Sequence, residues 1–170
     1  MKKSLQFFVA TVAVLGAAQT LSAQETATAT SSATILTPIS ITKTADMNFG
    51  NVAVQSSTAG TVILSAAGVR STTGGTTLPA TTGTVATAAF TVEGESGYTY
   101  AITLPSSALT ISSGLNTMTV SSFTSSPSAT GTLTGGSEDI TVGATLNVAA
   151  AQASGIYISG TPFNVTVNYN

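Results

Sequence analysis

The feature that most constrains this chain is an alternation of hydrophobic and polar residues with a period of two. It is clearest in the last eleven residues, GTPFNVTVNYN, which carry no formal side-chain charge. A period of two places successive side chains on opposite faces of a β-strand, whereas a helix needs a period of about 3.6. Helical spacing is scarcely visible after residue 23, so the pattern predicts an all-β protein.

The same alternation recurs between turns rich in Gly, Pro, Ser and Thr. The clearest hairpin is expected where residues 88–92 and 98–104 flank the turn EGESG. Other strands are expected near residues 33–42, 47–54, 61–65, 109–120 and 140–148. About eight to ten short strands of this kind predict an immunoglobulin-like antiparallel β-sandwich, with a β-barrel as the alternative.

Composition also predicts where strands stop. Proline cannot donate a hydrogen bond to a ladder, so Pro38 is expected to interrupt the first strand. Residues 69–85 are expected to be a long loop or a weak edge strand, and residues 121–136 a loop, because both are rich in Gly, Ser and Thr. The C-terminal run is expected to be one long strand of about 30 Å, at ~3.3 Å per residue.

The first 23 residues have the features of a signal peptide. Lys2 and Lys3 precede an apolar run over residues 5–18, and small residues lead to a cleavage site after Ala23. This run is shorter than the ~20 residues that span a bilayer, so the chain is not expected to be a transmembrane protein after cleavage. The prediction is an exported protein, located in the periplasm, on the outer surface or outside the cell.

The rest of the chain has the size of one domain. Residues 24–34 would be an N-terminal extension or a first strand, and residues 35–170 a single β-sandwich domain. After cleavage two basic side chains remain against six acidic ones, a net charge of −4. The sequence therefore lacks the basic patch of a nucleic-acid-binding protein. With no cysteine, it also lacks disulfides and a lipid-modified N-terminal cysteine.

Few residues could carry chemistry. The chain has no His and no Cys, which excludes a His general base, a Cys nucleophile and a Cys/His zinc site. We therefore expect no enzyme activity and no cofactor. Glu93 and Glu95 lie one residue apart in a turn, where they could bind Ca²⁺ together with carbonyl oxygens or serve as the acid/base pair of a glycosidase. The other interpretation is that they keep a hairpin tip soluble. The adjacent Glu138 and Asp139 could likewise bind a cation or be soluble surface charges.

The tyrosines allow two interpretations as well. Tyr98, Tyr100, Tyr157 and Tyr169 could form an aromatic platform for a sugar. By alternation, however, Tyr98 and Tyr100 share a face with Ile102 and Leu104, which favours packing in or beside the core. A monomeric, secreted binding module for a glycan or for calcium is the alternative function that these residues and the two glutamates suggest.

Two segments carry a resemblance to a known family. The stretch ISITKTADMNFGNV, and later GATLNV with SGIYISGTPFNVTVNYN, resemble the bacterial family of domains of unknown function DUF4402. The same ends are more distantly similar to the spore coat U domain and to archaic chaperone–usher pilins. The resemblance maps Phe49 and Gly50 onto a family turn. It maps a second group of residues onto a C-terminal hairpin: Gly155, Tyr157, Val165, Val167 and Tyr169.

The resemblance implies a structural role, because none of these positions is catalytic in the relatives. Pilins of that class are incomplete sandwiches that accept a strand from a neighbouring subunit. We therefore expect a fimbria-like or cell-surface coat subunit of a Gram-negative bacterium, with itself or related subunits as partners by strand addition. The alternative is a complete sandwich, since residues 24–32 offer only Ala27 and Ala29 as hydrophobic residues in the alternating series.

Overall fold

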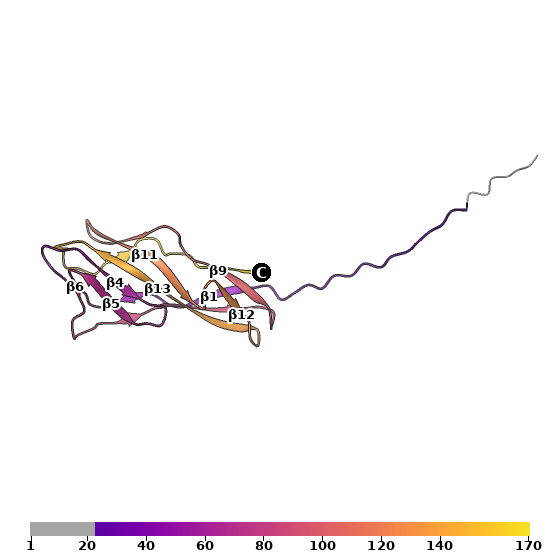
Figure 1. Ribbon diagram of the computed structural model, residues 1–170, viewed down its shortest axis with the longest axis horizontal. Helices are drawn as coiled ribbons and strands as arrows, with labels where there is room; N and C mark the ends of the chain where they lie inside the picture. The colour runs from indigo at the N-terminus through magenta and orange to yellow at the C-terminus, as the bar shows by residue number, and fades with distance from the viewer. Residues whose placement is uncertain (1–22) are drawn as a thin grey trace, which may run out of the picture. The chain divides into compact units, whose positions relative to one another are not determined.

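The computed structural model describes residues 23–170 (Figure 1). Residues 35–170 form one compact unit, and residues 23–34 contain no strand and expose every side chain. The described residues contain no helix, and so none that could cross a membrane. The predicted signal peptide lies outside the described residues, except for its last residue, Ala23.

The prediction of an all-β protein is confirmed. All named strand pairs are antiparallel. The strands are β1 (Ser40–Ala45), β2 (Asn48–Phe49), β3 (Ala53–Val54), β4 (Gly60–Leu64), β5 (Arg70–Gly74), β6 (Thr76–Thr77), β7 (Val85–Ala86), β8 (Ala88–Glu93), β9 (Thr99–Thr103), β10 (Leu109–Ser113), β11 (Asn116–Ser126), β12 (Thr130–Thr132), β13 (Ser137–Val148), β14 (Ile158–Ser159) and β15 (Thr166–Tyr169).

The largest sheet has eight strands and is organised around β13. Its main order is β1-β8-β13-β11-β10-β14. In addition, β4 pairs with β13, and β5 pairs with β4. Residues Ser137–Val142 of β13 pair with β8, and Ala144–Val148 pair with β4. Gly143 lies where the partner changes, and a Cβ atom there would collide with the carbonyl oxygen of Leu64. A glycine at this point allows the two partner strands to meet β13 end to end.

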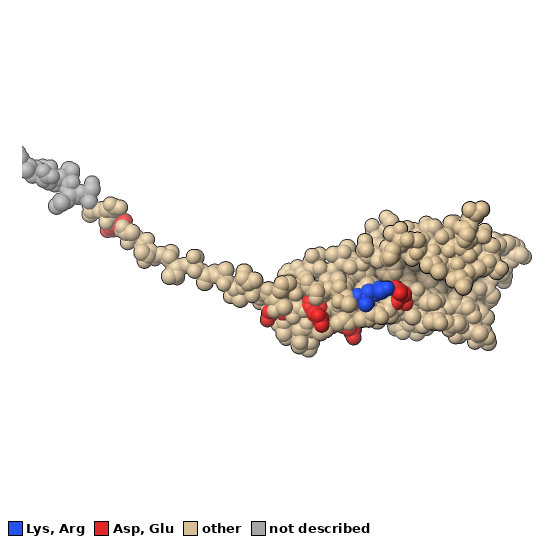
Figure 2. All heavy atoms as spheres, turned by 180° about the vertical axis from the view of Figure 1, so that it is seen from behind, with Lys and Arg blue, Asp and Glu red and all other residues tan. Residues whose placement is uncertain are grey.

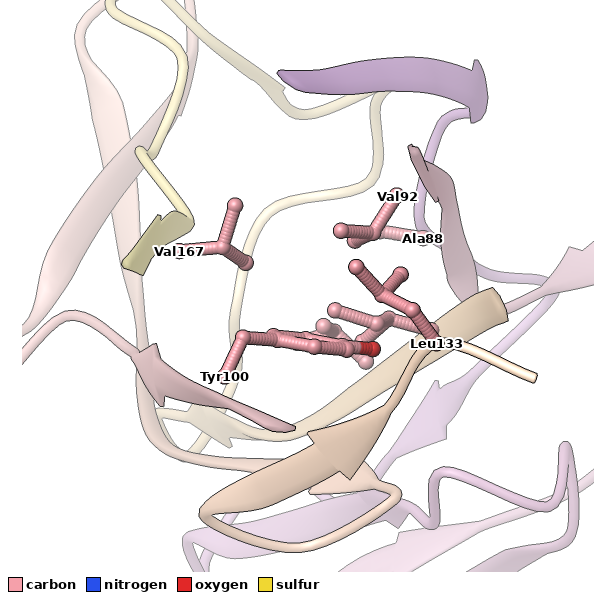
Figure 3. Packing of buried hydrophobic residues seen from close by; sticks show 7 residues of the cluster. Ala88, Val92, Tyr100, Leu133 and Val167 are labelled. Atoms are coloured by element: carbon pink, nitrogen blue, oxygen red, sulfur yellow. The ribbon is translucent and has the colours of Figure 1, made fainter. Parts of the chain in front are cut away.

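A three-stranded sheet, β12-β9-β15, lies across a shared core from the large sheet. Its side of the core contributes Tyr100, Val167 and the adjacent Leu133, and the large sheet contributes residues such as Ala88 and Val92. Figure 3 shows these five side chains directed toward one another between the strands. The core between two facing sheets agrees with the sandwich prediction.

A second core cluster lies at the other end of the large sheet. It consists of Val62, Val120, Ala144, Leu146 and Val148, all on β4, β11 and β13. Here the covering layer is made from two short strand pairs, β2–β7 and β3–β6, with their neighbouring residues. Figure 1 shows β4, β5 and β6 at the opposite end of the compact unit from β9 and β12.

The predicted hairpin between residues 88–92 and 98–104 is wrong. Strand β8 pairs with β1 and β13, whereas β9 pairs with β12 and β15 in the other sheet. The residues of EGESG therefore cross from one sheet to the other. Alternation correctly indicated the buried faces, because Val92 and Tyr100 both have no exposed surface. It could not distinguish two strands that pair from two strands that face each other across a core.

Three further boundaries differ from the prediction. The first strand begins only at Ser40, beyond Pro38, which has no N–H to donate. Strand β5 is an edge strand within 69–85, the alternative interpretation of that stretch. The expected loop 121–136 is mostly strand, since β11 extends to Ser126 and β12 follows.

Candidate interaction edge

Strand β15 forms one edge of the three-stranded sheet. It pairs with β9 on one side only, with Val167 opposite Ile102 and Tyr169 opposite Tyr100. The amide of Asn170 donates to the carbonyl oxygen of Thr99, so these two residues are a hydrogen-bonded pair. This shows which residues of β15 direct their backbone groups toward β9. In an antiparallel pair the backbone groups of alternate residues point away from the partner strand. The N–H and C=O groups of Val167 and Tyr169 therefore face the free edge.

Strand β1 is an edge of the large sheet, and it contacts β15. The two strands belong to different sheets and share no ladder within residues 23–170. Partly buried hydrophobic side chains from both sides pack against the core here: Ile39, Ile41, Phe163, Val165 and Tyr169. The side of the sandwich where β1 and β15 meet is thus lined by apolar side chains and by the unpaired backbone edge of β15.

The predicted long terminal strand is paired over only four residues. Residues 160–165 belong to no strand, although their hydrophobic side chains still alternate inward. The ladder ends at Thr103 and Thr166 because β9 stops just before Pro105, which cannot donate a hydrogen bond. Beyond this point the two segments separate around a hollow of about 360 Å³, lined by Leu104, Leu109, Phe163 and their neighbours.

At the C-terminal end of β15, the hydroxyl of Tyr169 forms two hydrogen bonds to other parts of the domain. It donates to the carbonyl oxygen of Thr37 at 2.7 Å and accepts from the amide of Glu95 at 2.6 Å. The carboxylate of Glu95 in turn accepts from the hydroxyl of Thr37 at 2.7 Å and from its amide at 3.1 Å. These bonds form a closed cycle that joins the start of the domain, the crossing loop and the C-terminal strand. We refer to these three residues as the Tyr169 cluster.

Glu93 and Glu95 do not share one environment. Glu93 ends β8, opposite Ser40 on β1 and Ser137 on β13, whereas the Glu95 carboxylate is bound to Thr37. Within residues 23–170 there is no group of three or more Asp or Glu side chains placed to hold a metal ion. The cation site suggested for the two glutamates stays a prediction, and the contacts give Glu95 a structural role.

The Tyr169 cluster predicts a pH dependence of stability. The hydrogen bonds from Thr37 lower the pKa of Glu95 below its usual value, because they favour the carboxylate. A carboxyl group with a lowered pKa in the folded state stabilises the protein above its unfolded pKa and loses that contribution as the pH falls through the folded value. We expect Glu95→Gln to lower the free energy of urea unfolding at pH 6, and the difference from the wild type to shrink below about pH 4. An equal difference at pH 3 and pH 6 would contradict this account.

The Phe49–Gly50 turn is built around an arginine. The guanidinium of Arg70 donates from Nη1 to the carbonyl oxygens of Phe49 at 2.7 Å and Asn51 at 3.0 Å. Gly50 has a φ of +69°, and a Cβ atom there would collide with the carbonyl oxygen of Thr82. The turn therefore requires glycine and holds one of the few basic side chains.

The other motif positions do not form the predicted terminal hairpin. Gly155 and Tyr157 lead into β14, which pairs with β10, whereas Val165, Val167 and Tyr169 lead into or form β15, which pairs with β9. The Tyr157 hydroxyl donates to the carbonyl oxygen of Ala153 and accepts from Gln152. Both halves of the motif are structural, but they stabilise different sheets.

The Phe49–Gly50 turn lies near one end of the domain sequence, and the Tyr169 strand lies near the other. The family model for the domain of unknown function DUF4402 matches residues 39–169, which include both features. The chain belongs to the DUF4402 family. No curated protein and no solved structure matches it. The more distant similarity to spore coat U domains and pilins is not confirmed by these comparisons.

Two structural residues of this DUF4402 domain were not identified from sequence. In the sequence, Thr37 is one polar position in the stretch 33–42, and Arg70 is one of four basic residues. A hydrophobicity pattern cannot identify either, because the Thr37 partners lie 58 and 132 residues away in sequence. The only sequence signal for Arg70 is its rarity as a basic residue.

The tyrosines of the DUF4402 domain also separate into different roles. Tyr100 is fully buried and donates from its hydroxyl to Glu138 at 2.9 Å. Burial, followed by this carboxylate, raises the pKa of Tyr100. Tyr98 is partly exposed and packs edge-on against Tyr169, with ring centroids 6.0 Å apart. A shared sugar platform that includes Tyr100 is excluded, since its ring lies in the core.

Proposed function

We propose that this chain is a secreted structural subunit, of fimbria-like or cell-surface coat type, that assembles by strand addition at the free edge of β15. The observation that carries the proposal is the unpaired, uncharged backbone edge of that strand. An exposed strand edge is a template for pairing with another chain, and proteins that stay monomeric usually protect it with lysine, proline or inward-pointing charge. Strand β15 has none of these residues.

Three of the other outer strands, β1, β12 and β14, are less suited to this role. Strand β1 carries Lys43, which pairs with Asp46 at 2.6 Å, and such a charge on an edge opposes strand pairing. Strand β12 contains three residues and β14 two. The edge of β15 extends backward through Asn164 and Val165, whose backbone lies in no strand. A strand added here would lie against the partly buried side chains of Val165 and Ile41.

The proposed donor is the segment 24–34 of another copy of the chain. Its residues alternate between hydroxyl side chains at even positions, from Thr26 to Thr34, and small side chains at odd positions, from Ala27 to Ala33. Every residue of the segment is exposed and none lies in a strand. Fully extended, eleven residues at ~3.3 Å each would reach about 36 Å, longer than β15 and its extension.

The proposal includes export across the inner membrane of a Gram-negative cell. It rests on the basic and apolar residues of the first 23 positions and on the cleavage pattern at Ala23. Mass spectrometry of the secreted protein would test it by identifying the first residue of the mature chain.

Assembly is tested by light scattering on the protein purified from a periplasm, beside a version without residues 24–34. We expect the longer chain to form polymers and the shorter chain to stay monomeric. Thr166→Lys places a charge on the free edge and should reduce polymer formation at least tenfold. Thr130→Lys, on the opposite edge of the same sheet, is the matched control and should leave assembly unchanged.

Two results would contradict the proposal. The first is a full-length protein that stays monomeric at high concentration. The second is polymer formation that survives both the deletion and Thr166→Lys, because that would locate the contact on another surface. Circular dichroism of each variant checks that the β-structure is retained.

A further inference from the structure

A row of hydrogen-bonding side chains crosses the outer face of the large sheet. In the register, Thr73 lies opposite Thr61, Thr61 opposite Asn147, and Asn147 opposite Thr119. Directly paired residues share a face, and the next residues along, such as Val62 and Leu146, are buried on the other face. The four polar side chains therefore stand together on the outside, over about 14 Å for three inter-strand spacings of ~4.8 Å.

The row lines one side of a surface hollow of about 590 Å³. The start of β11 and the chain after β13 complete it, and contribute Thr117 and Gln152. A volume of a few hundred Å³ is in the range of small-molecule sites. None of the lining residues carries a charge: Ala59, Gly60, Thr61, Thr73, Gly74, Thr117, Met118, Thr119, Asn147, Val148, Ala149 and Gln152.

Two amide side chains in the hollow are held in one orientation. The Asn147 Nδ2 atom donates to the Thr119 carbonyl oxygen at 3.2 Å and to the Ser121 hydroxyl at 3.0 Å. The Gln152 Nε2 atom donates to the carbonyl oxygen of Thr117 at 3.3 Å and to Tyr157 at 2.8 Å. A backbone carbonyl can only accept, so neither amide can be reversed without losing these bonds.

This orientation leaves hydrogen-bonding groups available to a ligand. No residue within 23–170 donates to Asn147 Oδ1 or Gln152 Oε1, so each is a fixed, free acceptor. The hydroxyls of Thr61 and Thr73 bond each other at 2.7 Å. One hydroxyl of such a pair donates and the other keeps its own hydrogen, which can donate to a further partner. The hollow thus presents both acceptors and a donor whose positions are set by neighbouring strands.

The surroundings favour an uncharged ligand. Of the strands around the hollow, β4 and β11 have no charged residue, and β5 has only Arg70, whose Nη1 is bound to two carbonyl oxygens. Glu138 and Asp139 lie near the start of β13, opposite β8 rather than β4. Figure 2 shows coloured charged atoms in one half of the visible face and none in the half that contains β4 to β6. Among the residues that the structure describes, no charged side chain lines the hollow to attract an ion.

We infer that this hollow binds a neutral polyhydroxylated ligand, namely an uncharged oligosaccharide lying across strands β5, β4, β13 and β11. Sugar hydroxyls donate to the fixed amide oxygens and accept from the threonine pair. The inference is independent of strand addition at β15, because the hollow lies on the outer face of the other sheet. It also differs from a site at Glu93 and the exposed tyrosines.

The test is a titration of the ¹⁵N-labelled mature protein with four neutral probes, maltohexaose, cellohexaose, laminarihexaose and mannohexaose, followed by amide chemical shifts. At least one probe is expected to shift the amides of Thr61, Thr73 and Thr119 in a saturable manner. Thr73→Val removes the hydroxyl with little change of shape, and we expect about fivefold weaker binding, as for one lost hydrogen bond. Gln152→Ala removes a fixed acceptor and should weaken binding by a similar factor.

The matched control is Thr42→Val, an exposed threonine on β1, which should bind the probe as the wild type does. Polygalacturonate, an anionic polymer, should not compete. The inference is overturned if none of the four probes shifts these amides. It is also overturned if Thr73→Val and Thr42→Val bind equally, or if the shifts gather around Glu93 and Tyr98 instead.

Discussion

Replacement of Leu133 by alanine is expected to lower the free energy of unfolding by about 2–5 kcal/mol. Leu133 has no exposed surface, and it packs between Val92 of the large sheet and Tyr100 of the small one. Removal of its side chain leaves a cavity where the two sheets meet, and strands on both sides restrict how far the cavity can close. The change would be measured by urea unfolding followed by circular dichroism.

Leu115→Ala is the control for this substitution, since it removes the same atoms from a side chain that is fully exposed. Its effect should be within about 0.5 kcal/mol of zero. Equal effects of the two substitutions would show that the core between the sheets is not packed as described here.

Gly131→Ala should destabilise the protein by an amount on the order of 3 kcal/mol, large for one added methyl group. Gly131 lies on β12 directly opposite Tyr100. A Cβ atom at this position would collide with the Tyr100 ring and hydroxyl and with the Glu138 carboxylate. That carboxylate also accepts from the amide of Thr132 at 2.7 Å. Steric displacement would therefore break two hydrogen bonds around a buried ring.

Gly160→Ala provides the comparison, because a Cβ atom at Gly160 has no neighbour within 4 Å and the backbone there does not require glycine. We expect its unfolding curve to match the wild type within about 0.5 kcal/mol. If Gly131→Ala were as stable as Gly160→Ala, the Tyr100 side chain could move without cost, and this would contradict its fixed position in the core.

Most charged side chains of the compact unit are used to hold the fold. Lys43 pairs with Asp46, Arg70 binds two backbone carbonyls, and three acids accept hydrogen bonds from nearby hydroxyl or amide groups: Glu95, Glu138 and Asp139. The surface groups that a partner could bind are therefore mainly side-chain hydroxyls, side-chain amides and backbone groups. Both proposals use such neutral groups, the first through an open strand edge and the second through fixed side-chain amides.

Several features could be predicted from the sequence because they depend on neighbours in the chain. Alternation identified the inward side chains of the C-terminal run, and Val167 is indeed buried. The turn at Gly50 and the terminal VTVNY pattern identified the family, since these residues meet local backbone and packing requirements. The absence of His and Cys excluded whole classes of catalytic site without any structure.

The partners of each strand were decided only by the tertiary structure. Strands β8 and β9 have the pattern of a hairpin but face each other across the core, and the two halves of the terminal motif join different sheets. Every strand offers the same backbone donors and acceptors, so pairing depends on which long-range arrangement buries Tyr100, Leu133 and Val92 together. The Tyr169 cluster and the Asn147 row arise in the same way, from residues that become neighbours only when the sheets form. For the strands that alternation identified, sequence alone determined which face is buried, and the packing of the two sheets determined what that face meets.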